Sequence, residues 1–217
     1  MRVNQYIRYG IAAIFLFTIP ACRPPVTFDQ PQPPNAKSLS FFPKRLQGDY
    51  LSSDHVSVLT ISEVSAIREY DFASKLSKDS LFFNKYRLNG DTLTEITNGN
   101  QKHVFVAGDT IYADNSGTDT LFYISTTNVL KKFKGYYFLN KLYDKDAWTL
   151  QRLSLTGGIL TLSEITDSVH INQLKEITET PADTICSNFK LNQAQFNKFI
   201  SGNGFDSSEQ FTRISGK

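Results

Sequence analysis

The sequence predicts a mostly β fold, an antiparallel meander that forms a barrel-like or two-sheet domain with a short C-terminal helix. Beyond Phe41 the apolar runs are dominated by Val, Ile, Thr, Tyr and Phe, and turn residues interrupt them about every eight to twelve positions. Four such turns fall between Asn89 and Gly117. They leave no room for crossover helices, because a crossover connection needs about a dozen residues.

The N-terminal segment, residues 1–21, has the features of an export signal. Arg2 and Arg8 form a basic start, and an apolar run extends from Gly10 to Ile19. The run has about half of the roughly 20 residues that a membrane-spanning helix needs. Its length is typical of the apolar region of a secretory signal. We therefore expect residues 1–21 to direct export and to be removed.

The residues that follow this run point to a lipid anchor. The stretch Ile19-Pro20-Ala21-Cys22 resembles the lipobox of bacterial lipoproteins. The resemblance covers these positions alone, and it implies cleavage before Cys22, acylation of Cys22 and attachment to a membrane of the cell envelope, for which we expect the outer membrane. Several acyl chains on one residue anchor a protein stably, whereas one chain binds only marginally. The alternatives are an uncleaved anchor and a secreted protein with a coincidental cysteine.

Residues 22–40 are rich in proline, since five of the chain's eight prolines lie between Arg23 and Asn35. Such a stretch cannot build a core and prefers the extended polyproline II conformation. We expect a tether that holds the following domain, residues 41–217, away from the membrane by about 3.1 Å per residue. The alternative is a proline-rich recognition motif.

Glycine and asparagine mark the expected hairpin turns of the domain. The turns are expected at Asn89-Gly90-Asp91, Asn98-Gly99-Asn100, Ala107-Gly108-Asp109, Asp114-Asn115-Ser116-Gly117 and Thr156-Gly157-Gly158. Strands are expected at 81–88, 92–97, 102–106, 110–113, 120–125, 136–142, 147–155, 159–166 and 169–174. Asn192 is expected to cap a helix over Gln193–Ser201, which ends at Gly202 and buries Phe196, Phe199 and Ile200.

Weak internal similarity suggests two related halves, 41–127 and 128–217, joined by a connection at Asn128–Lys134. A Thr-apolar-Ser/Thr-Glu-apolar-Ser/Thr pattern recurs at Thr60–Ser65, Thr92–Thr97 and Thr161–Thr166. Convergence of exposed strand edges on Thr, Ser and Glu explains the pattern equally well. The Gly-x-aromatic openings at Gly48-Asp49-Tyr50 and Gly135-Tyr136-Tyr137 are similar to the start of lipocalin-like barrels, which keeps a closed barrel among the options.

Composition and motifs exclude several classes of function. The 23 basic residues include Arg2 and Arg8, so the mature chain has 21 basic and 21 acidic residues, and we expect no nucleic-acid partner. The histidines, His55, His103 and His170, are far apart and lack metal-ligand spacing, so no metal and no cofactor are expected. Cys186 is expected to be a buried, inert thiol.

Catalytic motifs are also missing from the sequence, and we expect the protein not to be an enzyme. There is no Gly-x-Ser-x-Gly elbow and no phosphate-binding loop. Carboxylates could serve a glycosidase as a pair. The candidates cannot be paired from the sequence; they are Asp49, Glu63, Glu95 and Glu164.

Aromatic residues, 13% of the chain, are the most informative surplus. They occur as neighbours, and neighbours on a strand point to opposite faces, so some rings lie outside a single core face. A sheet buried on both sides or a ligand cavity would account for them. The candidate ligand-binding residues are Tyr50, Phe83, Tyr137 and Trp148.

The expected function is a non-catalytic binding or structural role of a membrane-anchored envelope lipoprotein. The first alternative is a lipocalin-like carrier of a small apolar or aromatic ligand, which would need a cavity lined by the candidate aromatics. An envelope hydrolase ranks last and would need clustered carboxylates in a cleft. A protein-binding role would show an exposed aromatic patch or an unpaired sheet edge.

Overall fold

The computed structural model describes residues 26–81, 85–181, 187–206 and 208–216. It confirms the mostly β fold, with 53% strand in one large sheet and one small sheet. The strands are β1 (Val26–Phe28), β2 (Ser38–Leu39), β3 (Gly48–Ser52), β4 (Ser57–Ile61), β5 (Ser65–Ser77), β6 (Tyr86–Asn89), β7 (Thr92–Glu95), β8 (Gln101–His103), β9 (Phe105–Ala107), β10 (Thr110–Tyr123), β11 (Asn128–Phe133), β12 (Tyr136–Asp144), β13 (Ala147–Thr156), β14 (Ile159–Ser163), β15 (Ser187–Phe189) and β16 (Ser208–Gly216). The helices are α1 (Ser168–Thr178), α2 (Gln193–Ser201) and the single 3₁₀ turns η1 (Lys44–Leu46) and η2 (Lys78–Ser80).

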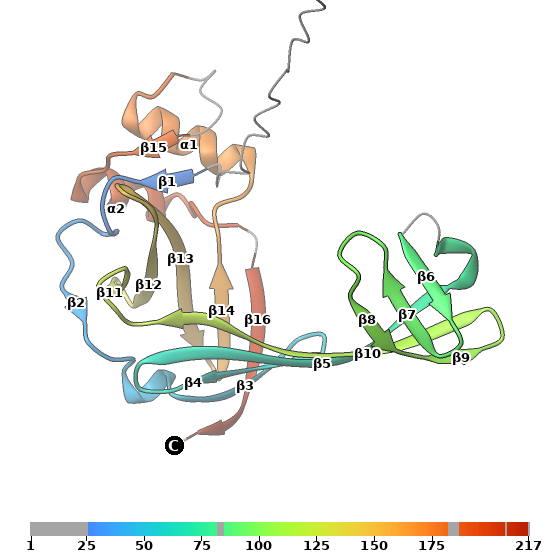
Figure 1. Cartoon of the computed structure of the whole chain (residues 1–217). Helices are drawn as coiled ribbons and strands as arrows, with labels where there is room; N and C mark the ends of the chain where they lie inside the picture. The colour runs from blue at the N-terminus through green and yellow to red at the C-terminus, as the bar shows by residue number, and fades with distance from the viewer. Residues whose placement is uncertain (1–25, 82–84, 182–186, 207, 217) are drawn as a thin grey trace, which may run out of the picture.

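The large sheet is open. Its strands follow the order β2-β11-β12-β13-β14-β16-β3-β4-β5-β10-β9, with β1 and β15 beside β13 (Figure 1). The path runs from β2 to β9 without returning, so the closed barrel, one of the expected forms, is not present. The pairings are antiparallel except for the parallel pair of β1 and β15. The strands of 41–127 and of 128–217 occupy separate stretches of this order, and they join where β16 pairs with β3.

The sheet curls around an inner core to which both stretches contribute. Its fully buried side chains include Tyr50 from β3, Tyr137 from β12 and Phe211 from β16. Burial of one such ring contributes on the order of 1.5–3 kcal/mol. The buried members of this core are Phe42, Leu46, Tyr50, Leu59, Ile61, Ala66, Phe122, Leu130, Tyr137, Leu139, Leu153, Leu160, Leu162 and Phe211.

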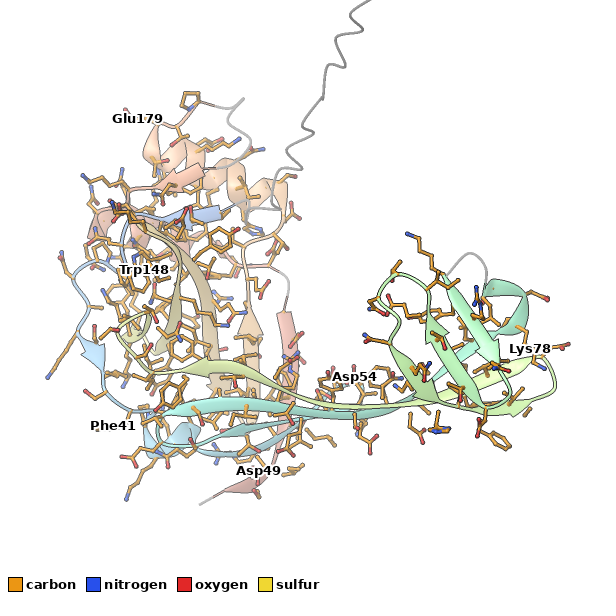
Figure 2. All side chains as sticks on the ribbon, in the orientation of Figure 1. Phe41, Asp49, Asp54, Lys78, Trp148 and Glu179 are labelled. Carbon is orange, nitrogen blue, oxygen red and sulfur yellow. The ribbon has the colours of Figure 1, made fainter. Side chains whose placement is uncertain are left out.

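A second, outer core lies on the opposite face of β12 and β13, under α1, α2, β1 and β15. Tyr137 points into the inner core, and its neighbour Phe138 packs in the outer core against Phe196 with ring centroids 5.3 Å apart. Phe41 and Phe42 also differ in their burial. Phe42 is buried, whereas Phe41, labelled in Figure 2, is exposed. At β12 the adjacent aromatics therefore serve a sheet that is buried on both sides, whereas Phe41 and Tyr123 remain exposed beside their buried neighbours.

The proline-rich segment differs from the expected tether, because residues 26–40 belong to the body of the protein. Strand β1 is buried between β13 and β15, and β2 pairs with β11. Proline cannot donate to a strand ladder, yet its carbonyl still accepts. The buried Lys131 ammonium donates to the carbonyls of Pro31 and Pro33, at 2.9 and 2.7 Å, and to that of Pro34.

Asn140 also holds the proline-rich segment on the sheet, and we call Lys131 and Asn140 together the clamp. Its side chain accepts from the backbone N–H of Gln32 at 2.6 Å and donates to the Gln32 carbonyl at 2.9 Å. Asn140 and the Gln32 side chain are fully buried. Two side chains of β11 and β12 thus replace the backbone pairing that the prolines cannot make. Burial lowers the pKa of Lys131 from its usual range.

The helical predictions are partly correct. The helix at Gln193–Ser201 is confirmed, with a capping box between Asn192 and Gln195. The strand expected at 169–174 is wrong, because this segment lies in α1, which Asp167 caps through the Val169 N–H. Its apolar residues recur at helical spacing and face the outer core; they are Ile171, Leu174 and Ile177. Neither helix of the described residues is long and apolar enough to cross a membrane.

Two segments expected to be irregular are strand, and one expected strand is shorter. The turn expected at Asp114–Gly117 is wrong, since these residues lie in the middle of β10 and pair with β5. The connection expected at Asn128–Lys134 is strand β11, and the turn lies at Lys134-Gly135, where both residues have positive φ. The strand expected at 81–88 is confined to β6 among the described residues. The other expected glycine turns are confirmed.

The long strands β5 and β10 build an arm. They remain paired far beyond the body, and at their end they carry β9 and the small sheet β6-β7-β8 (Figure 1). We call residues 69–118 the arm and residues 76–113 its lobe. The lobe has a small core of its own, which contains Leu93, Val104, Ile111 and Ala113.

Candidate functional site

The structure places two candidate ligand-binding residues in the inner core. Tyr50 is fully buried; its hydroxyl donates to the Leu46 carbonyl at 2.8 Å, and the Arg213 guanidinium lies 4.8 Å from its ring centroid. Burial raises the pKa of Tyr50, and Arg213 opposes this only in part. The hydroxyl of Tyr137, also fully buried, accepts from Arg45 Nε at 2.8 Å. Both rings thus have packed, hydrogen-bonded structural roles.

The remaining candidates lie elsewhere. Trp148 packs against the outer core, where β13 pairs with Phe28 of β1, and Figure 2 labels it in the part of the body near β1. Phe83 lies outside the described residues, as do Cys22 and Cys186. Trp148 therefore shares no core with Tyr50 and Tyr137, and the structure does not bring the candidates together at one site.

Three surface hollows among the described residues lie on or beside the arm. One of about 530 Å³ lies where the ribbon leaves the body and is lined by Arg68, Phe72 and Glu209 among others. One of about 710 Å³ lies between the ribbon and the small sheet and is lined by Lys102 and Asn115 among others. Tyr50, Tyr137 and Trp148 line neither of them, nor the hollows around Gly117 and Ile165. The candidate site is therefore the arm.

The middle of the arm carries an aromatic pair in which Phe72 is exposed and Tyr70 is half-buried. Tyr70 and Phe72 alternate with acidic residues on β5, so both project on one face, with ring centroids 6.2 Å apart. Phe72 is 41% exposed. Gly117 lies opposite Tyr70, and a Cβ atom there would come within 2.3 Å of the Tyr70 hydroxyl. The glycine lets the ring lie flat across the ribbon, which explains a turn-forming residue inside a strand.

A polar network continues this face toward the lobe. Asn115 Nδ2 donates to Ser74 Oγ at 2.9 Å, and Lys102 Nζ donates to Asn115 Oδ1 from the small sheet. The salt bridge of Arg68 with Glu209 flanks the other end of the aromatic pair. The face thus offers rings for apolar contact between groups that can donate or accept hydrogen bonds.

The end of the arm carries a second aromatic pair on its other face. Phe105, on β9, is 70% exposed, and its ring centroid lies 6.1 Å from that of Tyr112 on β10. The Lys75 ammonium lies 5.6 Å from the Tyr112 ring. We call these three residues the tip patch. Strand β9 is also the last strand in the sheet order, so one of its edges is unpaired within the described residues.

The exposed aromatics and the strand edge are features of binding surfaces. Aromatic residues are enriched at the centres of protein interfaces, and exposed sheet edges accept an added strand. The sequence signal for this site was available in part, because Phe105 and Tyr112 flank a confirmed hairpin turn at Gly108. The length of the ribbon was missed, because Asp114–Gly117 has the composition of a turn.

One group of titratable residues lies away from the arm. Asp167, His170 and Asp206 have side-chain atoms within 4.8 Å of one another. Burial raises the pKa of Asp206, but backbone hydrogen bonds from Thr166 and Asp167, aided by His170, outweigh it and lower the pKa overall. Asp167 caps α1, and Asp206 accepts from the backbone N–H of Thr166, just before α1. The group therefore joins the start of α1 to the segment after α2.

Comparisons with protein-family models, with curated proteins and with solved structures find no match for this chain. The class of protein therefore rests on the N-terminal sequence, residues 1–22, and on the arm.

Proposed function

We propose that this protein is a lipid-anchored lipoprotein of the cell envelope that binds a partner protein through its arm and performs no catalysis. The exposed rings of Phe72 and Phe105, each beside a half-buried tyrosine of the arm, are the observation that carries the proposed binding role. The anchor rests on Ala21 and Cys22, which directly follow an apolar run. The outer membrane is the proposed location.

The packing of the body supports a protein partner over a small apolar ligand. A carrier encloses most of its ligand in a preformed cavity. The rings that would have lined such a cavity, Tyr50 and Tyr137, are fully buried in contact with their neighbours. Phe72 and Phe105, in contrast, are open to solvent and project from a long ribbon, where a second protein can reach them.

The carboxylates also support a non-catalytic role. Asp49 accepts from Thr60 Oγ1 on the neighbouring strand, at 2.9 Å. Glu95 lies in the lobe, is half-buried and accepts from Thr97 Oγ1 at 2.7 Å. Glu164 follows β14 and accepts from Gln151 at 2.5 Å. These three carboxylates thus serve their own local structure on separate elements rather than forming a pair in a cleft, and the fourth candidate, Glu63, lies exposed between β4 and β5.

Replacement of Cys22 tests the anchor. We expect the full-length Cys22→Ser variant to be released from the membrane fraction, because it lacks the thiol that would be acylated. Cell fractionation and the mass of the mature N-terminal peptide measure the effect. Cys186→Ser is the matched control and should remain with the membranes. Membrane retention of Cys22→Ser equal to that of the natural protein would refute the anchor.

Site-specific photocrosslinking in intact cells tests the arm. We expect a photoreactive residue at position 72 or 105 to give a discrete protein adduct. The control is position 143 on β12, because Tyr143 is 45% exposed but lies outside the arm. The adduct from position 105 should weaken with Lys75→Ser, a surface change in the same tip patch that is expected to alter the free energy of unfolding by about 0.5 kcal/mol or less. Adducts from position 143 alone, or none from the arm, would contradict the proposed role.

A further inference from the structure

The route of the N-terminal segment bears on how the body meets the membrane. Only residues 23–25 separate Cys22 from Val26, the first residue of β1. Four consecutive peptide links span at most about 14 Å. The acyl chains of an anchored Cys22 would enter the hydrocarbon region, so Val26 would lie within about that distance of the lipid surface.

The proline-rich residues beyond Val26 cannot lengthen this link, because they are held on the body. Strand β1 is buried, and the Asp29 N–H donates to the Phe189 carbonyl at 3.1 Å. Lys131 and Asn140 then hold Gln32 and the carbonyls around it on the sheet. The segment expected to be a long tether is therefore part of the body, and the effective tether is three residues long.

The connection between β14 and α1 lies beside the start of β1. Val26 lines a hollow with Glu164, Ile165 and Thr166, the residues that lead into α1. One turn further, Val169 at the start of α1 is 67% exposed. A short link between Cys22 and Val26 would bring this part of the surface toward the membrane that holds the acyl chains of Cys22.

We propose that the body rests on the phospholipid headgroup layer through the β14–α1 connection and the first turn of α1. This inference rests on the proposed anchor at Cys22. The surface carries the carboxylates of Glu164 and Asp167 beside the Lys141 ammonium, so it has no excess of positive charge to attract anionic lipid, and the short covalent link would hold it there. In Figure 1 β5 and β10 cross the end of the body that lies opposite α1 and β1, and the arm extends sideways from there, so β9, which carries Phe105, lies away from this contact.

Depth-dependent fluorescence quenching tests the orientation. Acylated full-length Cys186→Ser protein is labelled with an environment-sensitive fluorophore after Val169→Cys or Phe105→Cys, and is reconstituted in phosphatidylcholine vesicles with nitroxide-labelled headgroups. We expect about threefold stronger quenching at position 169 than at position 105, because the link to Val26 spans at most about 14 Å.

A longer link provides the control. Insertion of about 15 Gly and Ser residues between Pro25 and Val26 adds a root-mean-square reach of about 20 Å without changing the body. Quenching at position 169 should then fall to the level at position 105. Vesicle flotation separates the two hypotheses. Protein that floats but shows equal quenching overturns the orientation alone, whereas protein that fails to float overturns the anchor and the orientation together.

Discussion

A chain that ends at Asp206 is expected to lose its cooperative unfolding transition. The deletion removes β16, which lies inside the large sheet between β14 and β3. Both neighbours would become unpaired edges, and the inner core would lose Phe211, which is 1% exposed. Loss of one buried Phe ring costs about 3–5 kcal/mol, and the two broken ladders add to this. Since a whole domain is stable by only about 5–15 kcal/mol, the shortened chain should not fold.

Urea denaturation followed by circular dichroism, together with size-exclusion chromatography, measures this effect. Ile214→Ala is the control on the same strand, because Ile214 is 57% exposed and should change the free energy of unfolding by about 0.5 kcal/mol or less. Fragments 41–127 and 128–217 test the same point from the other side. A sharp transition with an unchanged midpoint, either in the shortened chain or in the separate fragments, would show that β16 does not join two dependent stretches.

Asn140→Leu is expected to destabilise the protein by about 3 kcal/mol or more. Leucine has a similar volume but cannot accept from the Gln32 N–H or donate to the Gln32 carbonyl, which the native amide does at 2.6 and 2.9 Å. A buried donor or acceptor without a partner costs about 1–3 kcal/mol. Thermal or chemical denaturation gives the change in stability, and hydrogen exchange at the Gln32 amide reports whether the clamp opens.

The matched control is Asn172→Leu, at an exposed position of α1. It makes the same chemical change without removing a buried pair, so it should leave the stability nearly unchanged. If Asn140→Leu proves as stable as Asn172→Leu and the Gln32 amide stays protected from exchange, the clamp has no energetic role. The effective tether would then be longer, and the proposed membrane orientation would lose its support.

Local patterns in the sequence were sufficient for much of the fold. The expected hairpin turns form at Gly90 and at Gly157-Gly158, because positive φ at these glycines is a local requirement. Asn192 begins α2 as expected, because a cap depends on residues only three positions apart. The alternation of Tyr137 and Phe138 correctly indicated a sheet buried on both sides. Features determined within one turn or one strand were therefore readable.

Long-range partners decided the rest. Asp114–Gly117 became strand because β5 pairs with it, and Tyr70 covers Gly117 across the ribbon. Residues 169–174 became helix because their apolar side chains meet the outer core at helical spacing. In each case a distant surface overrode the local composition.

The function-bearing features divide along the same line. The proposed export signal and Cys22 are contiguous in the sequence, so the proposal of an anchor rests on the sequence alone. The docked proline-rich segment depends on Lys131 and Asn140, about 100 residues away, and the arm depends on the pairing of β5 with β10. Only the folded chain brings these groups together, because burial and hydrogen bonding between distant residues have no signature at any single position.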